Sequence, residues 1–215
     1  MKIFKDRTSA GKILVEHLKQ YQGMENILVL GIPRGGVVVA YEVAHELNLP
    51  LDIIVTRKIG APNQPELALG AVDGDGEVVW DKDLLRDLGF KIEDLREIVE
   101  KEAEEIKRRE TVYRQGKESL QMENKIVILI DDGIATGATT LAAINYLKRH
   151  EVKKIILAVP VASKESMEKV EREIGEMGEV IVLETPEYFQ AVGQFYQEFL
   201  PVSDDMVIRT LSLAV

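Results

Sequence analysis

Five short apolar runs rich in β-branched residues alternate with segments of helical periodicity along this chain of 215 residues. Runs of this length and composition are typical of strands that are buried on both faces of a sheet. Strand–helix–strand alternation requires crossover connections, so the pattern predicts an α/β fold with a mostly parallel five-stranded sheet flanked by helices. The expected strands are residues 27–30, 51–56, 125–130, 154–159 and 180–183.

The segments between these runs predict helices. Apolar residues fall on one helical face after the first run, and the same spacing recurs after the third run. Ser163 is the expected N-cap of a further helix that runs to about Ile174. The apolar faces of the first two helices consist of Val37, Ala40, Tyr41, Ala44 and Leu47, and of Leu141, Ile144 and Leu147.

Two insertions interrupt the alternation. Residues 59–81 are rich in Gly, Pro, Asp and Asn, and we expect a flexible loop at 59–72, then a hairpin turn at 73–76 between two short strands. Residues 92–114 predict a long, highly charged helix with a narrow apolar stripe. We expect this helix to lie solvated on the surface, and the alternative is a lid or dimer arm near the site. No internal repeat is visible, so residues 1–215 are predicted to form one domain with these insertions.

Composition disfavours several classes of function. The formal charge of −10 argues against a nucleic-acid partner, because duplex affinity depends mainly on Lys and Arg that neutralise phosphates. No apolar stretch approaches the roughly 20 residues that span a bilayer, and the N-terminus lacks the apolar core of a secretory signal. Cysteine is absent, and the three His residues have no metal-ligand spacing. We therefore expect a cytoplasmic protein that binds neither membrane nor nucleic acid.

The strongest functional signal lies in residues 125–140. The third expected strand ends in two adjacent carboxylates, Asp131 and Asp132, and a loop of Gly, Ala and Thr then leads into a helical pattern. Carboxylates accept hydrogen bonds from vicinal sugar hydroxyls, whereas N–H groups at a helix N-terminus bind phosphate. A sugar phosphate therefore fits both parts of this segment.

Two further loops follow expected strands, where ligands bind in open α/β sheets. The first contains Arg34, Gly35 and Gly36. These residues suit a pyrophosphate, because the glycines allow close approach and the cation balances charge, although an ordinary strand–helix turn has a similar composition. The second begins with Arg57 and Lys58, adjacent cations that suit the same anion or are simply surface charges.

Residues 127–139 resemble the motif of the type I phosphoribosyltransferase family that binds phosphoribosyl pyrophosphate (PRPP). In that motif, two acidic residues follow an apolar strand and precede a loop that ends Thr-Gly-x-Thr, as they do here. The resemblance implies that Asp131 and Asp132 contact the ribose hydroxyls of PRPP. It also implies a cradle for the 5′-phosphate that consists of Ala135, Thr136, Gly137, Ala138 and Thr139.

The resemblance extends to the leaving group and the metal. It implies that pyrophosphate is bound by Arg34, Gly35, Gly36, Arg57 and Lys58, of which the three cations are catalytic candidates. Such enzymes often hold a non-proline cis peptide in the first of these loops, and Arg34–Gly35 is its expected place. Mg²⁺ is expected as a chelate with PRPP oxygens and water, with Asp131 and Asp132 as candidate ligands.

The resemblance also implies a moving loop, an acceptor site and an assembly. The loop at 59–72 would close over PRPP and carry Glu66 into the site, and a homodimer is expected. Members of the family that act on 6-oxopurines have an acid where this chain has Ala135, which disfavours such an acceptor. The aromatic residues of 185–196 either pack into the core or form a wall of the acceptor pocket, within a hood-like segment expected at 185–215.

The predicted function is transfer of the 5-phosphoribosyl group from PRPP to a nucleobase-like nitrogen acceptor, with release of pyrophosphate, by a Mg²⁺-dependent enzyme of nucleotide metabolism. The alternative is a catalytically silent regulatory protein that binds PRPP or a nucleotide. Retention of Arg34, Arg57 and Lys58 favours the enzyme, because a sensor has less need to stabilise a leaving group. A Rossmann-type dinucleotide enzyme is disfavoured, because residues 31–36 do not form a G-x-G-x-x-G loop.

Overall fold

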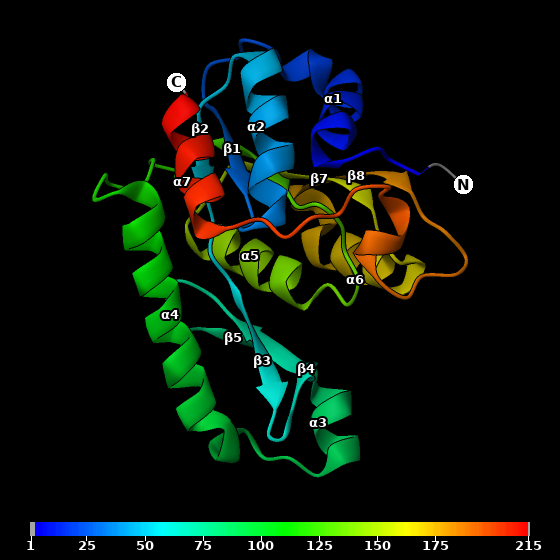
Figure 1. Ribbon diagram of the computed structural model, residues 1–215. Coiled ribbons are helices and arrows are strands. Elements are labelled where there is room, and N and C mark those ends of the chain that lie inside the picture. The colour runs from blue at the N-terminus through cyan, green and yellow to red at the C-terminus, as the bar shows by residue number, and fades with distance from the viewer. Residues whose placement is uncertain (1–2, 215) are drawn as a thin grey trace.

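The main sheet has five parallel strands, as the sequence predicts. The computed structural model describes residues 3–214, so Met1, Lys2 and Val215 of the expected single domain lie outside the described residues. The strand order is β2-β1-β6-β7-β8, and every neighbouring pair is parallel (Figure 1). The strands are β1 (Ile27–Gly31), β2 (Leu51–Ile53), β6 (Ile126–Ile130), β7 (Lys154–Val161) and β8 (Gly178–Glu184).

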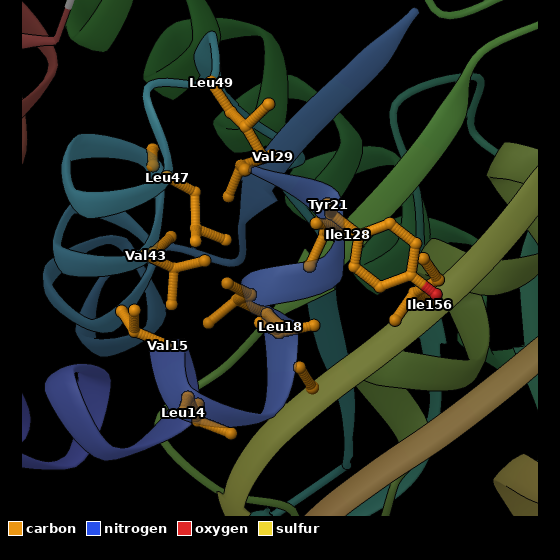
Figure 2. Close-up of a cluster of buried hydrophobic side chains, with 14 of the residues drawn as sticks. Leu14, Val15, Leu18, Tyr21, Val29, Val43, Leu47, Leu49, Ile128 and Ile156 are labelled. Atoms are coloured by element: carbon orange, nitrogen blue, oxygen red, sulfur yellow. The ribbon is translucent and has the colours of Figure 1, made fainter. Parts of the chain in front are cut away.

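Helices cover both faces of this sheet. On one face lie α1 (Arg7–Leu18) and α2 (Gly35–Leu47), and on the other lie α5 (Ala138–Arg149) and α6 (Lys164–Ile174). Along β6, Ile128 belongs to the first apolar cluster and Leu129 to the second, because successive side chains of a strand point to opposite faces. Figure 2 shows the first cluster, in which residues of α1 and α2 pack against the sheet; the labelled side chains are Leu14, Val15, Leu18, Tyr21, Val29, Val43, Leu47, Leu49, Ile128 and Ile156.

Two helices that the sequence pattern does not predict complete the main domain. The first is α1, which begins after Asp6, whose carboxylate accepts a hydrogen bond from the N–H of Ser9. The second is α7 (Asp204–Leu213), which Ser203 caps in the same way and which packs against α2 and α4. Both helices are stabilised by packing against distant parts of the chain, which local patterns reveal poorly.

The two expected insertions form a single small lobe beside the main sheet (Figure 1). It contains an antiparallel sheet of β3 (Arg57–Ala61), β4 (Gln64–Val72) and β5 (Val78–Trp80), followed by α3 (Lys82–Leu88) and α4 (Arg96–Arg114). The hairpin turn predicted at 73–76 is confirmed between β4 and β5. The expected loop at 59–72 is instead a β-hairpin, since strand pairing overrides its Gly and Pro content. Whether this hairpin moves stays a prediction.

Helix α4 connects the lobe to the main domain through its predicted apolar stripe. Leu95, just before the helix, is buried in the lobe's own core, and Ile106 is buried in a cluster that also contains Val37 of α2 and Val207 of α7. Most of the charged side chains of α4 remain exposed, as expected for a helix on the surface. Among residues 3–214, no helix combines the length and apolarity needed to cross a membrane.

Two ion pairs fix the base of the lobe. The Arg114 guanidinium lies 2.9 Å from the Asp52 carboxylate in β2, and Arg149 of α5 lies 2.6 Å from Asp73. The Asp73 residue is only 1% exposed and also accepts hydrogen bonds from the N–H groups of Asp75 and Glu77. A carboxylate this deeply buried depends on its partners, because desolvation penalises an unpaired charge.

We predict that Arg149→Gln lowers the free energy of unfolding by about 2 kcal/mol, since it leaves the buried Asp73 carboxylate without its cation. Urea denaturation measures the change. Lys153→Gln, which removes an exposed cation four residues further along the chain, is the control and should have little effect. Adding Asp73→Asn to Arg149→Gln should restore part of the lost stability, and a double variant less stable than Arg149→Gln would contradict the explanation.

Candidate functional site

Loops from three elements form one cavity at the carboxyl edge of the main sheet. The cavity has a volume of about 330 Å³ and lies among the loop after β1, the loop after β6 and the start of β3. Nine of the predicted site residues line it: Arg34, Gly35, Lys58, Asp131, Asp132, Ala135, Thr136, Gly137 and Thr139. Its other walls include Val192 and Phe199 from the C-terminal segment. The structure therefore brings together three loops that are separate in the sequence.

The two carboxylates are held by different partners. One oxygen of Asp131, Oδ1, accepts a hydrogen bond from the N–H of Asp132 at 2.8 Å. The Oδ2 atom of Asp132 accepts a hydrogen bond from Nε of Arg7 at 2.7 Å. The backbone carbonyl of Asp132 accepts a hydrogen bond from the Tyr196 hydroxyl at 2.6 Å. Both carboxylates keep lone pairs for additional donors.

Burial makes this pair difficult to ionise. Burial and then the neighbouring charge of Asp132 raise the pKa of Asp131 well above its usual range. Burial also raises the pKa of Asp132, although the adjacent Arg7 guanidinium opposes this rise. Perturbed carboxyl pairs in a cavity are typical of functional sites.

Two glycines of the loop after β1 lie directly against these carboxylates. A Cβ atom on Gly35 would lie 1.8 Å from Oδ2 of Asp132, and one on Gly36 would lie 2.8 Å from Cα of Asp131. No side chain fits at either position. The cis peptide bond in this loop joins Pro33 to Arg34, so the prediction of Arg34–Gly35 is wrong by one residue.

The loop after β6 has the form of an anion cradle. Gly137 has a φ of +80°, a conformation that favours glycine, and α5 begins at the next residue. No N–H group of residues 135–139 donates a hydrogen bond within the described part of the chain. The hydroxyl-bearing residues Thr136 and Thr139 line the same cavity, whereas Ala138 lies outside its lining. Free N–H groups at a helix N-terminus are suited to a phosphate.

The predicted cations occupy different environments. Lys58 lines the cavity, whereas Nε of Arg57 lies 2.6 Å from Glu102 of α4. Neighbouring side chains of a strand point to opposite sides, and of these two residues only Lys58 lines the cavity in this conformation. The expected joint role of Arg57 and Lys58 stays a prediction, and it requires the Arg57–Glu102 ion pair to open. Arg34 lies at the cavity, and its exposed guanidinium is 3.5 Å from Asp204 of α7.

The remaining predicted residues lie at the margins. Gly36 packs behind Asp131 and does not line the cavity. Glu66 is exposed on β4 and lies outside the cavity lining in this conformation. Its expected entry into the site therefore depends on movement of the β3–β4 hairpin.

Arg7 is a residue of the site that the sequence pattern does not predict. Its guanidinium carbon lies 3.8 Å from the centre of the Phe199 ring, and its Nη1 atom donates to the carbonyl of Leu200 at 2.8 Å. These contacts hold the cation beside Asp132, which is 125 residues away in the sequence. No local signal marks such a contact.

The C-terminal aromatic residues lie in different environments. Phe195 and Tyr196 are buried with Phe4, and the backbone of Phe4 pairs with this segment, which confirms core packing for both. Tyr188 is 87% exposed and takes no part in the core. Phe199, which follows the most aromatic stretch, is the ring that forms part of the cavity wall.

A parallel α/β sheet with paired carboxylates, a glycine loop and free helix amides at one edge is typical of a protein that binds a phosphorylated sugar. Residues 7–192 match the family model of the phosphoribosyl transferase domain. The chain therefore belongs to the phosphoribosyl transferase family.

Individual relatives agree with this assignment. Two curated Mycobacterium tuberculosis proteins, from strains CDC 1551 / Oshkosh and ATCC 25618 / H37Rv, are provisionally named phosphoribosyl transferases and are each 42% identical to this chain over 214 residues. The alignments cover 100% of this chain and 47% of each relative, so the chain spans about half their length. The crystal structure of TT1426 from Thermus thermophilus is 39% identical, with a TM-score of 0.79 and coverage of 98% of both chains.

A more distant structure shares the fold alone. It is that of a hypothetical protein from Neisseria gonorrhoeae with bound ppGpp, which is 13% identical and has a TM-score of 0.53. The match covers 99% of this chain and 97% of that protein.

We predict that Asp131→Asn raises the stability of the unliganded protein at neutral pH. The folded-state pKa of Asp131 lies above its unfolded value, so ionisation of this group opposes folding. The penalty is absent at acidic pH, where both states are protonated, and it grows as pH rises toward the folded pKa. Calorimetry from about pH 4 to about pH 8 should show the variant's Tm advantage growing with pH, to roughly 2 °C or more.

The control for this experiment is Glu118→Gln, which neutralises an exposed carboxylate. It should change Tm little at any pH in the range. An Asp131→Asn variant that melts at or below the wild-type temperature at neutral pH would show that the carboxylate is not under electrostatic strain.

Proposed function

We propose that the chain transfers the 5-phosphoribosyl group from PRPP to a nitrogen acceptor and releases pyrophosphate. One observation supports this proposal most strongly: a single cavity contains a carboxylate pair, a free-amide loop and a glycine loop with a cation. These three features suit the diol, the monoester and the diphosphate of one molecule of PRPP. Membership of the phosphoribosyl transferase family agrees with this ligand.

The carboxylates and the amide loop fix the two ends of the ribose phosphate. Asp131 and Asp132 accept hydrogen bonds from the ribose hydroxyls and, when ionised, balance the positive charge that develops on the sugar. Amides of residues 135–139 bind the 5′-phosphate, with hydroxyl donors from Thr136 and Thr139. When the carboxylates and the amides bind the two ends of the ribose phosphate, C1 lies beside the glycine loop, where the leaving group departs.

The leaving pyrophosphate is held by cations and amides. Arg34 and Lys58 line the cavity and provide charge where negative charge develops, and Gly35 allows close backbone approach there. Gly36 supports this loop from behind, against Asp131. Arg57 contributes only after its ion pair with Glu102 opens. Closure of the β3–β4 hairpin would exclude water and bring Glu66 to the site.

Mg²⁺ dependence is part of the proposal. Asp131 and Asp132 supply the hard oxygen atoms that Mg²⁺ prefers, but within residues 3–214 no cluster of three or more metal-ligating side chains occurs. This partial set fits an ion held jointly with substrate oxygens and water. Bound Mg²⁺ would neutralise charge on the diphosphate.

The acceptor is proposed to be nucleobase-like, bound between PRPP and the wall of Val192 and Phe199. Ala135 offers no acid to a 6-oxopurine, which disfavours that class. A homodimer in the cytoplasm, acting in nucleotide metabolism, completes the proposal by analogy with the family.

We predict that the double variant Asp131→Asn/Asp132→Asn weakens PRPP binding by at least about 100-fold, because charge-assisted hydrogen bonds to the ribose hydroxyls are lost. Titration calorimetry with PRPP and Mg²⁺ measures the change, and Glu118→Gln is the charge control. Wild-type affinity in the double variant would show that the ribose lies elsewhere.

A pyrophosphate-release screen with Mg²⁺-PRPP against free bases and small amines tests catalysis itself. With a productive acceptor, Arg34→Ala should lower kcat by about 100-fold and change PRPP affinity far less, because the leaving group gains charge in the transition state. Equal losses in both parameters would assign Arg34 to ground-state binding. Binding of PRPP without release for any acceptor would favour the regulatory alternative.

A further inference from the structure

We propose that Ser166, assisted by Ser163, is a positioning residue that orients the phosphate cradle. This inference rests on the proposed function, because it concerns how the loop after β6 presents its amides. The Ser166 hydroxyl is 2.6 Å from the carbonyl oxygen of Ala135, and the Ser163 hydroxyl is 2.9 Å from the same oxygen. Both serines belong to the start of α6, and the cradle itself precedes α5.

The hydrogen bonds form a short relay. The two hydroxyl oxygens lie 2.8 Å apart, and the N–H of Ser166 donates to Oγ of Ser163. Each hydroxyl has one proton, so the shorter contact assigns Ser166 as the principal donor to Ala135. The Ser163 hydroxyl then donates either to Oγ of Ser166 or, as a second donor, to the Ala135 carbonyl. Hydrogen bonds in series strengthen one another in a buried environment.

The geometry of the peptide unit links these hydrogen bonds to the direction in which the loop amides point. In a trans peptide, the C=O and the following N–H point in opposite directions. The Ala135 carbonyl points to Ser166, so the N–H of Thr136 points away from α6. The Ile134 carbonyl accepts a hydrogen bond from the N–H of Ser163 at 3.0 Å, which orients the N–H of Ala135 in the same manner. Two successive amides of the proposed cradle are thus fixed by the start of α6.

Burial makes the contact specific. Ser166 is 2% exposed and packs close to the loop, since a Cβ atom on Gly137 would lie 3.6 Å from Cβ of Ser166. Ser166→Ala therefore removes the shorter of the two donors to the Ala135 carbonyl. The Ala135 carbonyl then keeps only the longer Ser163 contact, which fixes the amides of the loop less firmly.

The test compares two anions that use different parts of the cavity. Ser166→Ala should weaken binding of ribose 5-phosphate by about 5- to 10-fold and leave binding of inorganic pyrophosphate unchanged, as measured by titration calorimetry. Ser212→Ala is the matched control, because the Ser212 hydroxyl also donates to a backbone carbonyl, that of Arg209, on an exposed part of α7. It should bind both ligands as the wild type does.

Other results of this experiment would contradict either the inference about Ser166 or the proposed function. Wild-type affinity for ribose 5-phosphate in Ser166→Ala would overturn the inference, as would equal weakening of both ligands, which marks a general structural defect. If the wild type itself does not bind ribose 5-phosphate, the proposed function fails. Should Ser166→Ala fold poorly, Ser166→Cys preserves the packing with a weaker donor. A partial loss is then expected for ribose 5-phosphate alone, and no loss would overturn the inference.

Discussion

The contact between the glycine loop and the carboxylate pair governs the site. Residues Gly31 and Ile130 are register partners in β1 and β6, so the loops that follow these strands emerge side by side. Atoms of Asp131 and Asp132 occupy the space where side chains of Gly35 and Gly36 would lie. This exclusion of side chains allows the cation of one loop and the acids of the other to share one cavity. The parallel sheet thus determines which chemical groups meet.

The same closeness creates an electrostatic cost. Two carboxylates that are adjacent in sequence and largely removed from water repel each other, and within residues 3–214 only Asp132 has a guanidinium partner, which is Arg7. The segment around Phe199 and Leu200 fixes that guanidinium, so α1 and the C-terminal segment both support the acids. A ligand that donates hydrogen bonds or carries positive charge relieves the repulsion. The fold is therefore more favourable with the site filled.

The sequence predicts the features that depend on local patterns of residues. It predicts poorly the contacts between segments that are far apart in the chain. The five buried strands are marked by uninterrupted apolar runs, and the 73–76 turn by its Gly and Asp residues. The motif of residues 127–139 predicts a site at these acids and this loop, and most of its predicted site residues line one cavity. The single small lobe, the Arg7 contact and the relay from Ser166 all join segments far apart in the chain. Their pairing depends on tertiary packing, which leaves no periodic signal in either segment.

Ion pairs and apolar packing fix the base of the lobe, which limits how it can act. Asp52–Arg114 and Asp73–Arg149 tie it to β2 and α5, and the buried cluster around Ile106 adds apolar contact. Figure 1 shows β3 and β4 extending from this base away from the main sheet. Any movement of the hairpin must therefore be a bend along the strands and not a detachment of the lobe. The irregular pairing near Gly60 is the natural place for that bend, since a bulge weakens the ladder there.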